Sequence, residues 1–463
     1  MTAKNEKVTE EVVYAKHQKI YPRKVSGTFA NFRVVAVLAL LGLYYGLPWL
    51  DIGGQQSVLF NLPERKFYIF GMIFWPQDFF YMALLLIIAA LALFFVTAVA
   101  GRVWCGYACP QTVWTELFLW IEQRIEGDRP KQMKLDKASW TSDKITKKGV
   151  KHTVWLLLGL WTGFTFVGYF TPIKELAQSV LTLSLGPWET FWVIFYGLAT
   201  WANAGFMREQ VCIYMCPYAR FQSAMFDNNT LIVSYDQKRG DPRGRRKKGS
   251  DLKAQSLGDC VDCTLCVQVC PTGIDIRDGL QYQCIGCAAC VDVCDDVMAK
   301  VGYEKGLIRY TTENSLVSGE KLHIMRPRVV VYSLIMFAFV VGLVYAVVQR
   351  VPLELDIIKD RNTLYRENGE GMIENVYTLK LINMDDAKHS YTLDVTGIEG
   401  VKMRGVDNLV VPSGKILERV ITLEVDPANL PETSNWLVFY LKSSQNSAIA
   451  VEEDARFLGP TNL

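Results

Sequence analysis

Five apolar stretches constrain the fold of this chain more than any other feature of its sequence. A helix needs about 20 apolar residues to cross a bilayer. Five runs approach or reach that length, and they are Val34–Leu50, Phe79–Ala100, Thr153–Phe170, Phe191–Phe206 and Val329–Val348. Buried core helices are the alternative, but 50% of the 463 residues are hydrophobic and only 21% are charged. The sequence therefore predicts an α-helical bundle with five membrane spans.

The Lys and Arg residues between these runs predict how the helices are oriented. The segments before, between and after the five runs carry 7, 2, 10, 1, 17 and 12 Lys and Arg residues in turn. Positive charge concentrates in cytoplasmic loops, whereas a long terminal domain is translocated regardless of its charge. Residues 1–33 and 207–328 are therefore expected in the cytoplasm, and residues 349–463 outside it. The polar start of the chain has no signal-peptide pattern, so the first run is expected to act as an uncleaved insertion signal.

Two short cysteine motifs follow the second and fourth runs, within or just after the predicted four-helix region 34–206. Both read C-x-Y-x-C-P, and their cysteines are Cys105, Cys109, Cys212 and Cys216. Residues four apart lie on one face of an α-helix, so each pair is expected to hold its thiols close together. Thiolates select Cu(I), zinc or iron–sulfur clusters. The alternative is that these cysteines are small apolar fillers, but the repeat favours a metal or redox site.

The strongest motif is a pair of four-cysteine runs at about residues 255–300. Each run has the spacing C-x2-C-x2-C-x3-C of bacterial two-cluster ferredoxins, in which each run lends its last cysteine to the other cluster. One predicted [4Fe–4S] cluster therefore has the ligands Cys260, Cys263, Cys266 and Cys294. The other has the ligands Cys284, Cys287, Cys290 and Cys270. Zinc bound by C-x2-C knuckles is the alternative. Asp295 follows Cys294 where ferredoxins usually have proline. This change is expected to affect the potential of the cluster that Cys294 binds.

The distribution of the cysteines agrees with the charge pattern. All 12 fall between residues 105 and 294, and none lies in the predicted outside domain. Free thiols and iron–sulfur clusters require a reducing compartment, which is the expected location of this part of the chain. The formal net charge is only +2, which argues against a globally basic protein that binds nucleic acid.

The end of the chain predicts an immunoglobulin-like β-sandwich after the fifth span at 329–348. Strand-like segments are Val376–Ile382, Tyr391–Val395, Leu409–Val411, Ile416–Val425 and Trp436–Leu441. Gly, Asn, Asp and Pro separate them at short intervals, as in sandwich domains. No catalytic constellation is recognisable there, so contact with a partner protein or simple support is the expected role.

The histidines argue against a haem-based electron carrier. His17, His152, His323 and His389 all lie outside the predicted spans, whereas a bis-histidine haem needs paired histidines within them. All four are expected to be ordinary surface residues.

The order of these modules resembles the CcoG/FixG/RdxA family of cytochrome c oxidase accessory proteins, over nearly the whole chain. The resemblance implies a multi-pass protein of the bacterial inner membrane with a periplasmic terminal domain. It also implies that the protein reduces Cu(II) to Cu(I) for assembly of the cbb3-type oxidase. The four C-x-Y-x-C-P cysteines would bind and reduce copper, and the eight ferredoxin cysteines would relay electrons. Implied partners are oxidase assembly factors and copper chaperones or a copper transporter. The electron donor is not identified, and a homodimer stays open.

Two other functions fit the same motifs. A membrane quinol dehydrogenase of the NapH type would also pair spans and C-x3-C-P motifs with ferredoxin clusters, and would pass electrons from quinol to an outside partner. The terminal sandwich favours the oxidase-accessory function over this one. A non-catalytic assembly scaffold with structural clusters is the third hypothesis.

Overall fold

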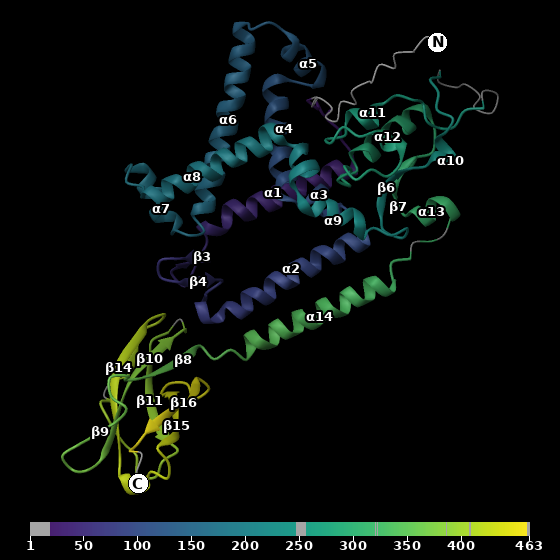
Figure 1. Ribbon diagram of the computed structural model, residues 1–463. Coiled ribbons are helices and arrows are strands. Elements are labelled where there is room, and N and C mark those ends of the chain that lie inside the picture. Colours follow the sequence, from purple (N-terminus) through teal and green to yellow (C-terminus); the bar gives the residue numbers. More distant parts are fainter. Residues whose placement is uncertain are drawn as a thin grey trace, which may run out of the picture. The chain divides into compact units, whose positions relative to one another are not determined.

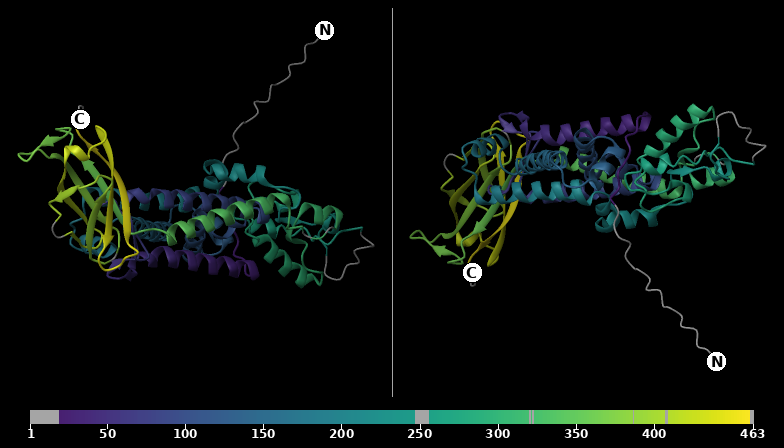
Figure 2. Two further views of the ribbon diagram at one scale, coloured as in Figure 1. Left: turned by 90° about the horizontal axis from the view of Figure 1, so that it is seen from below. Right: turned by 90° about the horizontal axis from the view of Figure 1, so that it is seen from above.

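The computed structural model describes residues 19–246, 256–319, 321, 323–385, 387–406 and 409–460. The first 18 residues of the predicted N-terminal segment, with His17, lie outside the described residues. The chain divides into two compact units (Figures 1 and 2). The cysteine unit consists of Met1–Leu43, Ala92–Phe164 and Phe191–Ser333, and the sandwich unit consists of Tyr44–Leu91, Thr165–Thr190 and Leu334–Leu463. All 12 cysteines belong to the cysteine unit.

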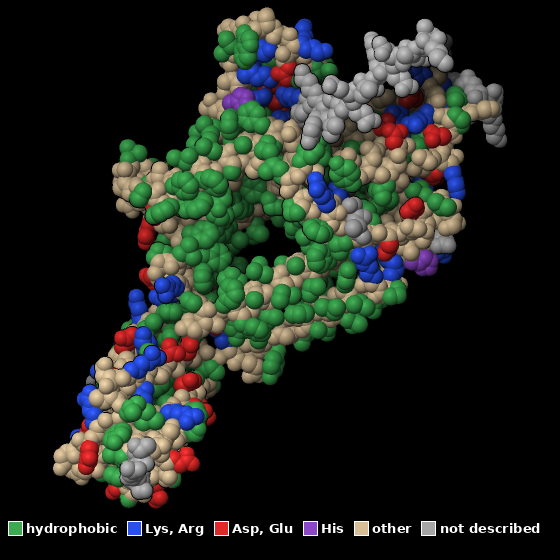
Figure 3. All heavy atoms as spheres, in the orientation of Figure 1, with side chains coloured by type: hydrophobic (Ala, Val, Ile, Leu, Met, Phe, Trp, Pro, Cys, Tyr) green, Lys and Arg blue, Asp and Glu red, His purple; other side chains and the backbone are tan. Residues whose placement is uncertain are grey.

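Four helices in the described part of the chain are long and apolar enough to cross a membrane. They are α1 (Thr28–Gly46), α2 (Phe79–Ala100), α6 (Ser142–Val167) and α14 (Pro327–Val348), and they match the first, second, third and fifth predicted runs. Only 11% of the most apolar window of α2 and 6% of that of α14 is buried. Hydrophobic side chains accordingly cover both helices in Figure 3. Helices that expose such apolar surfaces indicate a membrane protein.

The fourth predicted run does not form one regular helix. The α-helix α8 (Pro187–Thr200) has 14 residues, fewer than the roughly 20 that a bilayer requires. A π-helical segment, η3 (Trp201–Met207), continues it and ends at Arg208, whose φ is +41°. A fifth span and the orientation of the helices therefore stay predictions.

The rest of the cysteine unit consists of short elements. Those around the C-x-Y-x-C-P motifs are α3 (Val103–Tyr107), α4 (Pro110–Glu126), α5 (Arg129–Lys137), η4 (Val211–Met215) and α9 (Pro217–Met225). Those of the ferredoxin module are β6 (Ile232–Tyr235), α10 (Gln237–Gly240), α11 (Leu265–Gln268), η5 (Ile276–Asp278), α12 (Ala289–Val301), β7 (Ile308–Thr311) and α13 (Glu313–Ser318). Antiparallel pairing of β6 with β7 closes the module, because it brings together strands on either side of both cysteine runs.

The sandwich unit ends in a β-rich domain made of two antiparallel sheets. Its strands are β8 (Leu353–Lys359), β9 (Arg366–Glu367), β10 (Ile373–Asn383), β11 (His389–Thr396), β12 (Lys402–Arg404), β13 (Val410–Val411), β14 (Ile416–Val425), β15 (Ser434–Ser443) and β16 (Ala450–Leu458). One sheet has the order β12-β14-β10-β8, with β9 also paired to β10, and the other has the order β13-β11-β15-β16. Alternate residues of β10 are buried, and Tyr377 meets Phe439 of the second sheet edge-on at 5.7 Å. Four of the five predicted strand segments fall within these strands, and the fifth, Leu409–Val411, overlaps β13 but begins one residue before it.

The remaining elements of the sandwich unit precede α2 or follow α6, apart from one turn inside the sandwich. They are η1 (Leu47–Trp49), β1 (Asp51–Ile52), β2 (Gln55–Gln56), β3 (Val58–Asn61), β4 (Lys66–Ile69), β5 (Met72–Phe74), η2 (Pro76–Asp78), α7 (Ile173–Leu181) and η6 (Pro427–Asn429). The three-stranded sheet β3-β4-β5 packs on the β-rich domain through Ile73 and Trp75, which form one buried cluster with Ile382 and Met384.

The expectation that the histidines are ordinary surface residues is wrong for His389. His389 is the first residue of β11, and its side chain lies on the buried face and is only 6% exposed. Its Nε2 lies 2.7 Å from Asp385 Oδ2, and its Nδ1 lies 3.1 Å from Ser443 Oγ. His152 is partly buried and stacks on Phe206, whereas His323 is exposed.

Candidate metal and electron-transfer site

The two ferredoxin runs share one backbone shape. In each run a residue in the left-handed region stands directly before and directly after the second of the four cysteines, which is Cys263 in one run and Cys287 in the other. These residues are Asp262 (φ +53°) and Thr264 (φ +57°) in the first run, and Gly286 (φ +67°) and Ala288 (φ +57°) in the second. Non-glycine residues rarely adopt this conformation, and it persists at functional sites where the surroundings enforce it. The resulting turns bend each run around its second cysteine.

Two small cavities in the module are lined by thiols. The first cavity is lined by Cys260, Cys263, Cys266 and Cys294. The second is lined by Cys270, Cys284, Cys287 and Cys290, and Cys266 also borders it. These are the two sets that the ferredoxin spacing predicts, and a set of four thiols fits the ligand demand of a [4Fe–4S] cluster. Among the described residues, no three Cys, His, Asp or Glu side chains converge closely enough to hold a single metal ion.

Burial favours the protonated form of several of these thiols. It raises the pKa of Cys266, Cys284 and Cys294 to about 12 each. A metal ligand must be the thiolate, so binding of a metal centre here releases protons and depends on pH.

The two C-x-Y-x-C-P motifs also fold alike, but not as one continuous helix. Cys105 lies in α3 and Cys212 in the π-helical η4, whereas Cys109 and Cys216 are the N-cap residues of α4 and α9. The expectation that each pair lies on one face of an α-helix is therefore wrong. The proline after each second cysteine opens a new helix, and it disfavours the helical conformation in the cysteine before it. Cys109 and Cys216 thus lie at helix N-termini, and burial raises the pKa of Cys109 above its usual range.

The structure brings the four thiols of these motifs into one neighbourhood. The Cys212 thiol interacts electrostatically with those of Cys105, Cys109 and Cys216. Cys105 Sγ donates a hydrogen bond of 3.3 Å to Oε1 of Gln222, a fully buried residue of α9, so the first motif is tied to the helix that follows the second. Burial raises the pKa of Cys105 to about 11 and that of Cys212 to about 12.

The first motif also touches the second cluster cavity. A Cβ added to Gly106 would lie 2.9 Å from Cα and N of Cys287 and 2.9 Å from the carbonyl oxygen of Ile285. Cys105 and Cys290 both pack against the buried apolar cluster that includes Cys287. Tyr107 donates a hydrogen bond of 3.4 Å from its hydroxyl to the carbonyl oxygen of Cys287. The two sulfur-rich sites are therefore joined backbone to backbone.

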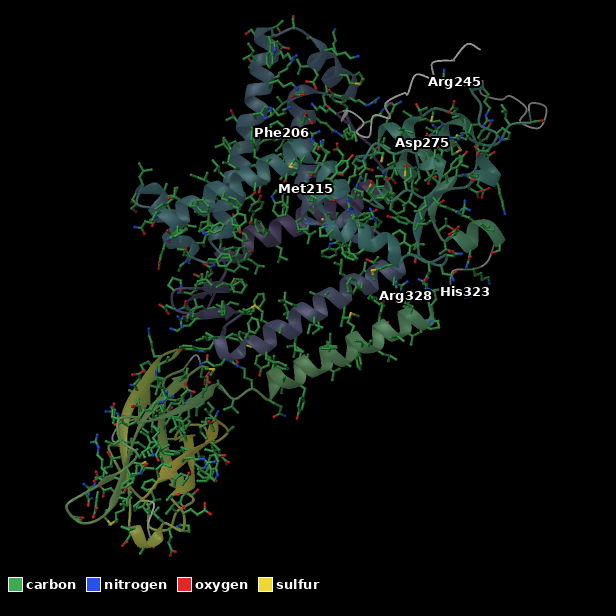
Figure 4. The ribbon with its side chains drawn as sticks, viewed as in Figure 1. Phe206, Met215, Arg245, Asp275, His323 and Arg328 are labelled. Atoms are coloured by element: carbon green, nitrogen blue, oxygen red, sulfur yellow. The ribbon has the colours of Figure 1, made fainter. Side chains whose placement is uncertain are left out.

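A buried ion network positions the second motif. Glu122 of α4 is 1% exposed, and its carboxylate lies 2.7 Å from Arg208 Nη2 and 3.1 Å from Lys151 Nζ. Arg208 stands between the two π-helical segments, which Phe206 and Met215 mark in Figure 4. Gln111 Nε2 donates to the Arg208 carbonyl at 3.1 Å and to the Asn203 carbonyl at 2.9 Å.

Sequence reasoning missed these positioning residues. The sequence did contain an indication of this buried network. Glu122 and Glu126 stand four residues apart among apolar side chains of α4. Glu126 is also buried, at 4% exposed, and pairs with Lys148 and Lys151. Acidic side chains are almost never buried unless they are paired.

Three family models match parts of the chain. A 4Fe-4S binding domain matches residues 82–127, a 4Fe-4S dicluster domain matches residues 207–313, and the Ig-like fold at the C-terminus of FixG matches residues 343–460. The first match includes Cys105 and Cys109, so it covers the motif that the resemblance assigned to copper. The second includes all eight cysteines of the ferredoxin runs.

Three relatives match most of the chain. It is 40% identical over 428 residues to the nitrogen fixation protein FixG of Rhizobium meliloti (strain 1021), covering 85% of this chain and 82% of that protein. It is 42% identical over 397 residues to protein RdxB of Cereibacter sphaeroides, covering 83% of both chains. It is 41% identical over 419 residues to protein RdxA of the same organism, covering 87% of this chain and 88% of that one.

Proposed function

The chain belongs to the FixG/RdxA family of iron–sulfur proteins, and we propose that it is a membrane oxidoreductase that reduces Cu(II) to Cu(I). Electrons would pass through two [4Fe–4S] clusters to copper bound by the C-x-Y-x-C-P thiols. The observation that carries this proposal is the backbone contact of Gly106 with Cys287, because it joins a cluster site to the thiol site. The Cu(I) product would be delivered to a cbb3-type oxidase through copper carriers and assembly factors.

The cluster ligands in this proposal are the two sets of four thiols described above. When bound, each [4Fe–4S] cluster supplies one electron at a time. One electron converts one Cu(II) to one Cu(I), so the thiols themselves undergo no net oxidation.

The residues of the thiol site fit this chemistry. Thiolates are soft ligands that favour Cu(I) over Cu(II), which prefers nitrogen and oxygen. Cys109 and Cys216 are the N-cap residues of α4 and α9, and burial raises the pKa of Cys109, so its thiol must also lose a proton when the ion binds. Burial raises the pKa of Cys105 and Cys212, so their thiols release protons to water as the ion binds.

A reduction assay tests the proposal. The protein is purified without oxygen, its clusters are reduced, and Cu(II) is added with a chelator specific for Cu(I). We expect Cu(I) to form in proportion to the reduced clusters, and we expect the Cys→Ser variant at all four C-x-Y-x-C-P positions to lose this activity. The matched control is Gly149→Ala in α6, where an added Cβ meets nothing within 4 Å. Copper reduction that survives in the four-serine variant would contradict the proposal.

The match of a 4Fe-4S binding domain over residues 82–127 favours a second candidate. Here the C-x-Y-x-C-P thiols hold a further iron–sulfur cluster, and the protein passes electrons from quinol to an outside partner. Iron analysis separates the two functions. Two clusters correspond to about 8 iron atoms per chain and three to about 12. Iron content that falls by about 4 atoms in the four-serine variant would support the second candidate, and unchanged iron content supports copper as the substrate.

Loss of the clusters separates both redox functions from a scaffold. Serine variants of the ferredoxin cysteines would stop an electron relay. An oxidase that is still assembled and active in cells carrying such variants would show that the clusters have a structural role only.

A further inference from the structure

We propose that the two cluster sites are electrostatically unequal, and that electrons therefore run from the Cys260 set to the Cys284 set and on to the C-x-Y-x-C-P thiols. Arg33 is the main residue that sets this direction. The inference deepens the proposed function, because it gives the electron path an order.

A buried cation lies beside the second site. Arg33 is 8% exposed, and its guanidinium has the Cys287 thiol as an electrostatic and hydrogen-bonding neighbour. The carboxylate paired with it, Glu116, lies 3.6 Å away and is 34% exposed, so it compensates the charge only weakly. Arg33 Nε is buried and has no hydrogen-bond partner among the described residues. Glu116 is also an electrostatic neighbour of the Cys287 thiol, so the positive charge of Arg33 at this thiol is only partly compensated.

The position of Arg33 is fixed by the ferredoxin module itself. Asp292, which lies between the last two cysteines of the second run, accepts hydrogen bonds from the backbone N–H groups of Phe29 (3.2 Å) and Ala30 (2.7 Å). The carboxylate therefore caps the start of α1, about one turn before Arg33. Its own negative charge is engaged with the positive end of that helix, which offsets its effect on the second cluster.

A second buried arginine adds positive charge near the second cluster site. Arg102 is 6% exposed and is an electrostatic neighbour of the Cys284 thiol. Its guanidinium donates to the backbone carbonyls of Tyr282 and Ala219 rather than to a carboxylate. Two arginines thus face the cluster site that touches Gly106.

The first site has the opposite surroundings. Arg277 lines its cavity, but Nη1 of Arg277 lies 2.7 Å from Asp262 Oδ1 and Nη2 lies 2.6 Å from Asp275 Oδ2. The negative charge of these two carboxylates thus exceeds the positive charge of the one guanidinium. Asp275 is labelled in Figure 4. Asp295 adds a third carboxylate as an electrostatic neighbour of Cys294. The net charge around the first site is therefore negative.

These charges order the reduction potentials of the two clusters. Reduction adds a negative charge to a cluster, so nearby cations raise its potential and nearby carboxylates lower it. The effect is strong at buried positions, where screening by water is weak. The cluster at the Cys284 set is the better electron acceptor, and it is the one joined to the copper thiols.

A redox titration of the full-length protein tests the inference without copper. Wild-type protein is expected to show two resolved midpoint potentials by electron paramagnetic resonance. Arg33→Met should shift the higher potential downward and leave the lower one in place, while Arg33→Lys should keep the wild-type value because it keeps the charge. Asp262→Asn should shift only the lower potential upward. Asp262 is 40% exposed, and Asn tolerates its left-handed backbone, so this variant folds even if Arg33→Met does not.

Two results would overturn the inference. In the first, Arg33→Met shifts the lower of the two potentials. In the second, neither Arg33→Met nor Asp262→Asn shifts any potential although the iron content is unchanged. Because no copper is present, a protein that fails the copper assay can still show these shifts. Equally, copper reduction with a reversed order of potentials would leave the proposed function intact and refute the direction.

Discussion

At the scale of single residues, Gly106 sets how closely the first C-x-Y-x-C-P motif approaches the ferredoxin module. Its neighbours at 2.9 Å are backbone atoms of Cys287 and Ile285, which cannot turn aside as the end of a flexible side chain can. Glycine is therefore required at this position by close approach, and its φ lies outside the left-handed region.

We expect Gly106→Ala to lower the free energy of unfolding by about 1–3 kcal/mol, the usual cost of overpacking. It should also slow electron transfer to copper, because the backbones must separate. Chemical denaturation and single-turnover Cu(I) formation measure the two effects. Gly149→Ala is the control and should be neutral or slightly stabilising in its open helical position. Equal behaviour of the two variants would show that the contact has no role.

Ligand residues and positioning residues differ in how far the sequence reveals them. Cysteines at fixed spacing were recognisable because cluster chemistry demands four thiolates from short turns. The two sets predicted from that spacing line the two cavities. Arg33, Arg102 and Gln222 were not recognisable, because each acts on a cysteine more than 70 residues away, and no local pattern records such a contact.

At the scale of elements, the helix that bears the second motif is irregular and depends on a buried ion network. Glu122 accepts from Arg208, which joins the two π-helical segments at a positive φ. Breaking a buried pair by removing one partner leaves an uncompensated charge, which costs about 3–5 kcal/mol. We expect Glu122→Gln to lower the thermal unfolding temperature at pH 7 and to weaken copper binding at Cys212 and Cys216. Asp143→Asn, which breaks only the exposed pair with Lys147, should change neither.

The same carboxylate predicts a pH dependence. Burial acts to raise the pKa of Glu122, but Arg208 and Lys151 lower it from its ordinary value of 4.5 to about 2. A carboxyl group whose pKa falls on folding stabilises the protein above its ordinary pKa, and this contribution is lost as the pH falls. The difference in unfolding temperature between wild type and Glu122→Gln should therefore be full at pH 6 and shrink between about pH 4.5 and pH 2. A difference that stays constant across this range would contradict the assignment.

Elements were predictable where their hydrophobic pattern is regular. The strand Ile416–Val425 was predicted with its observed bounds, because apolar residues recur along it between turn residues. The strand β16 (Ala450–Leu458) was missed because its middle reads Glu-Glu-Asp and most of its residues are exposed. The fourth apolar run was predicted as one helix, since composition does not reveal where α-helical hydrogen bonding gives way to π-helical bonding.

At the scale of the whole molecule, composition and charge predict a membrane protein with its cysteines in the cytoplasm. Four helices meet the length and hydropathy that a bilayer requires within the described ranges, which supports membrane insertion but leaves the number of spans and the orientation as predictions. Orientation follows from the cell's insertion machinery acting on Lys and Arg, so an isolated fold does not record it.

Reporter fusions measure the orientation. A reporter active only in the periplasm should be active when fused after Leu463, and a cytoplasmic reporter should be active at the N-terminus and inactive after Leu463. Fusions in the segment between α13 and α14 should report the cytoplasm. Cytoplasmic activity after Leu463 would overturn the five-span prediction and would place the sandwich on the same side as the cysteines.

The cap on α1 has a consequence for how the protein is made. Ala30 and the Asp292 carboxylate that accepts from its N–H group are 262 residues apart in the chain. During translation α1 therefore leaves the ribosome, and enters the membrane, long before its capping residue has been synthesised. The two hydrogen bonds that cap α1 can form only once Asp292, between the last two cysteines of the second run, has left the ribosome. The start of α1 therefore stays uncapped until nearly all of both cysteine runs has been synthesised.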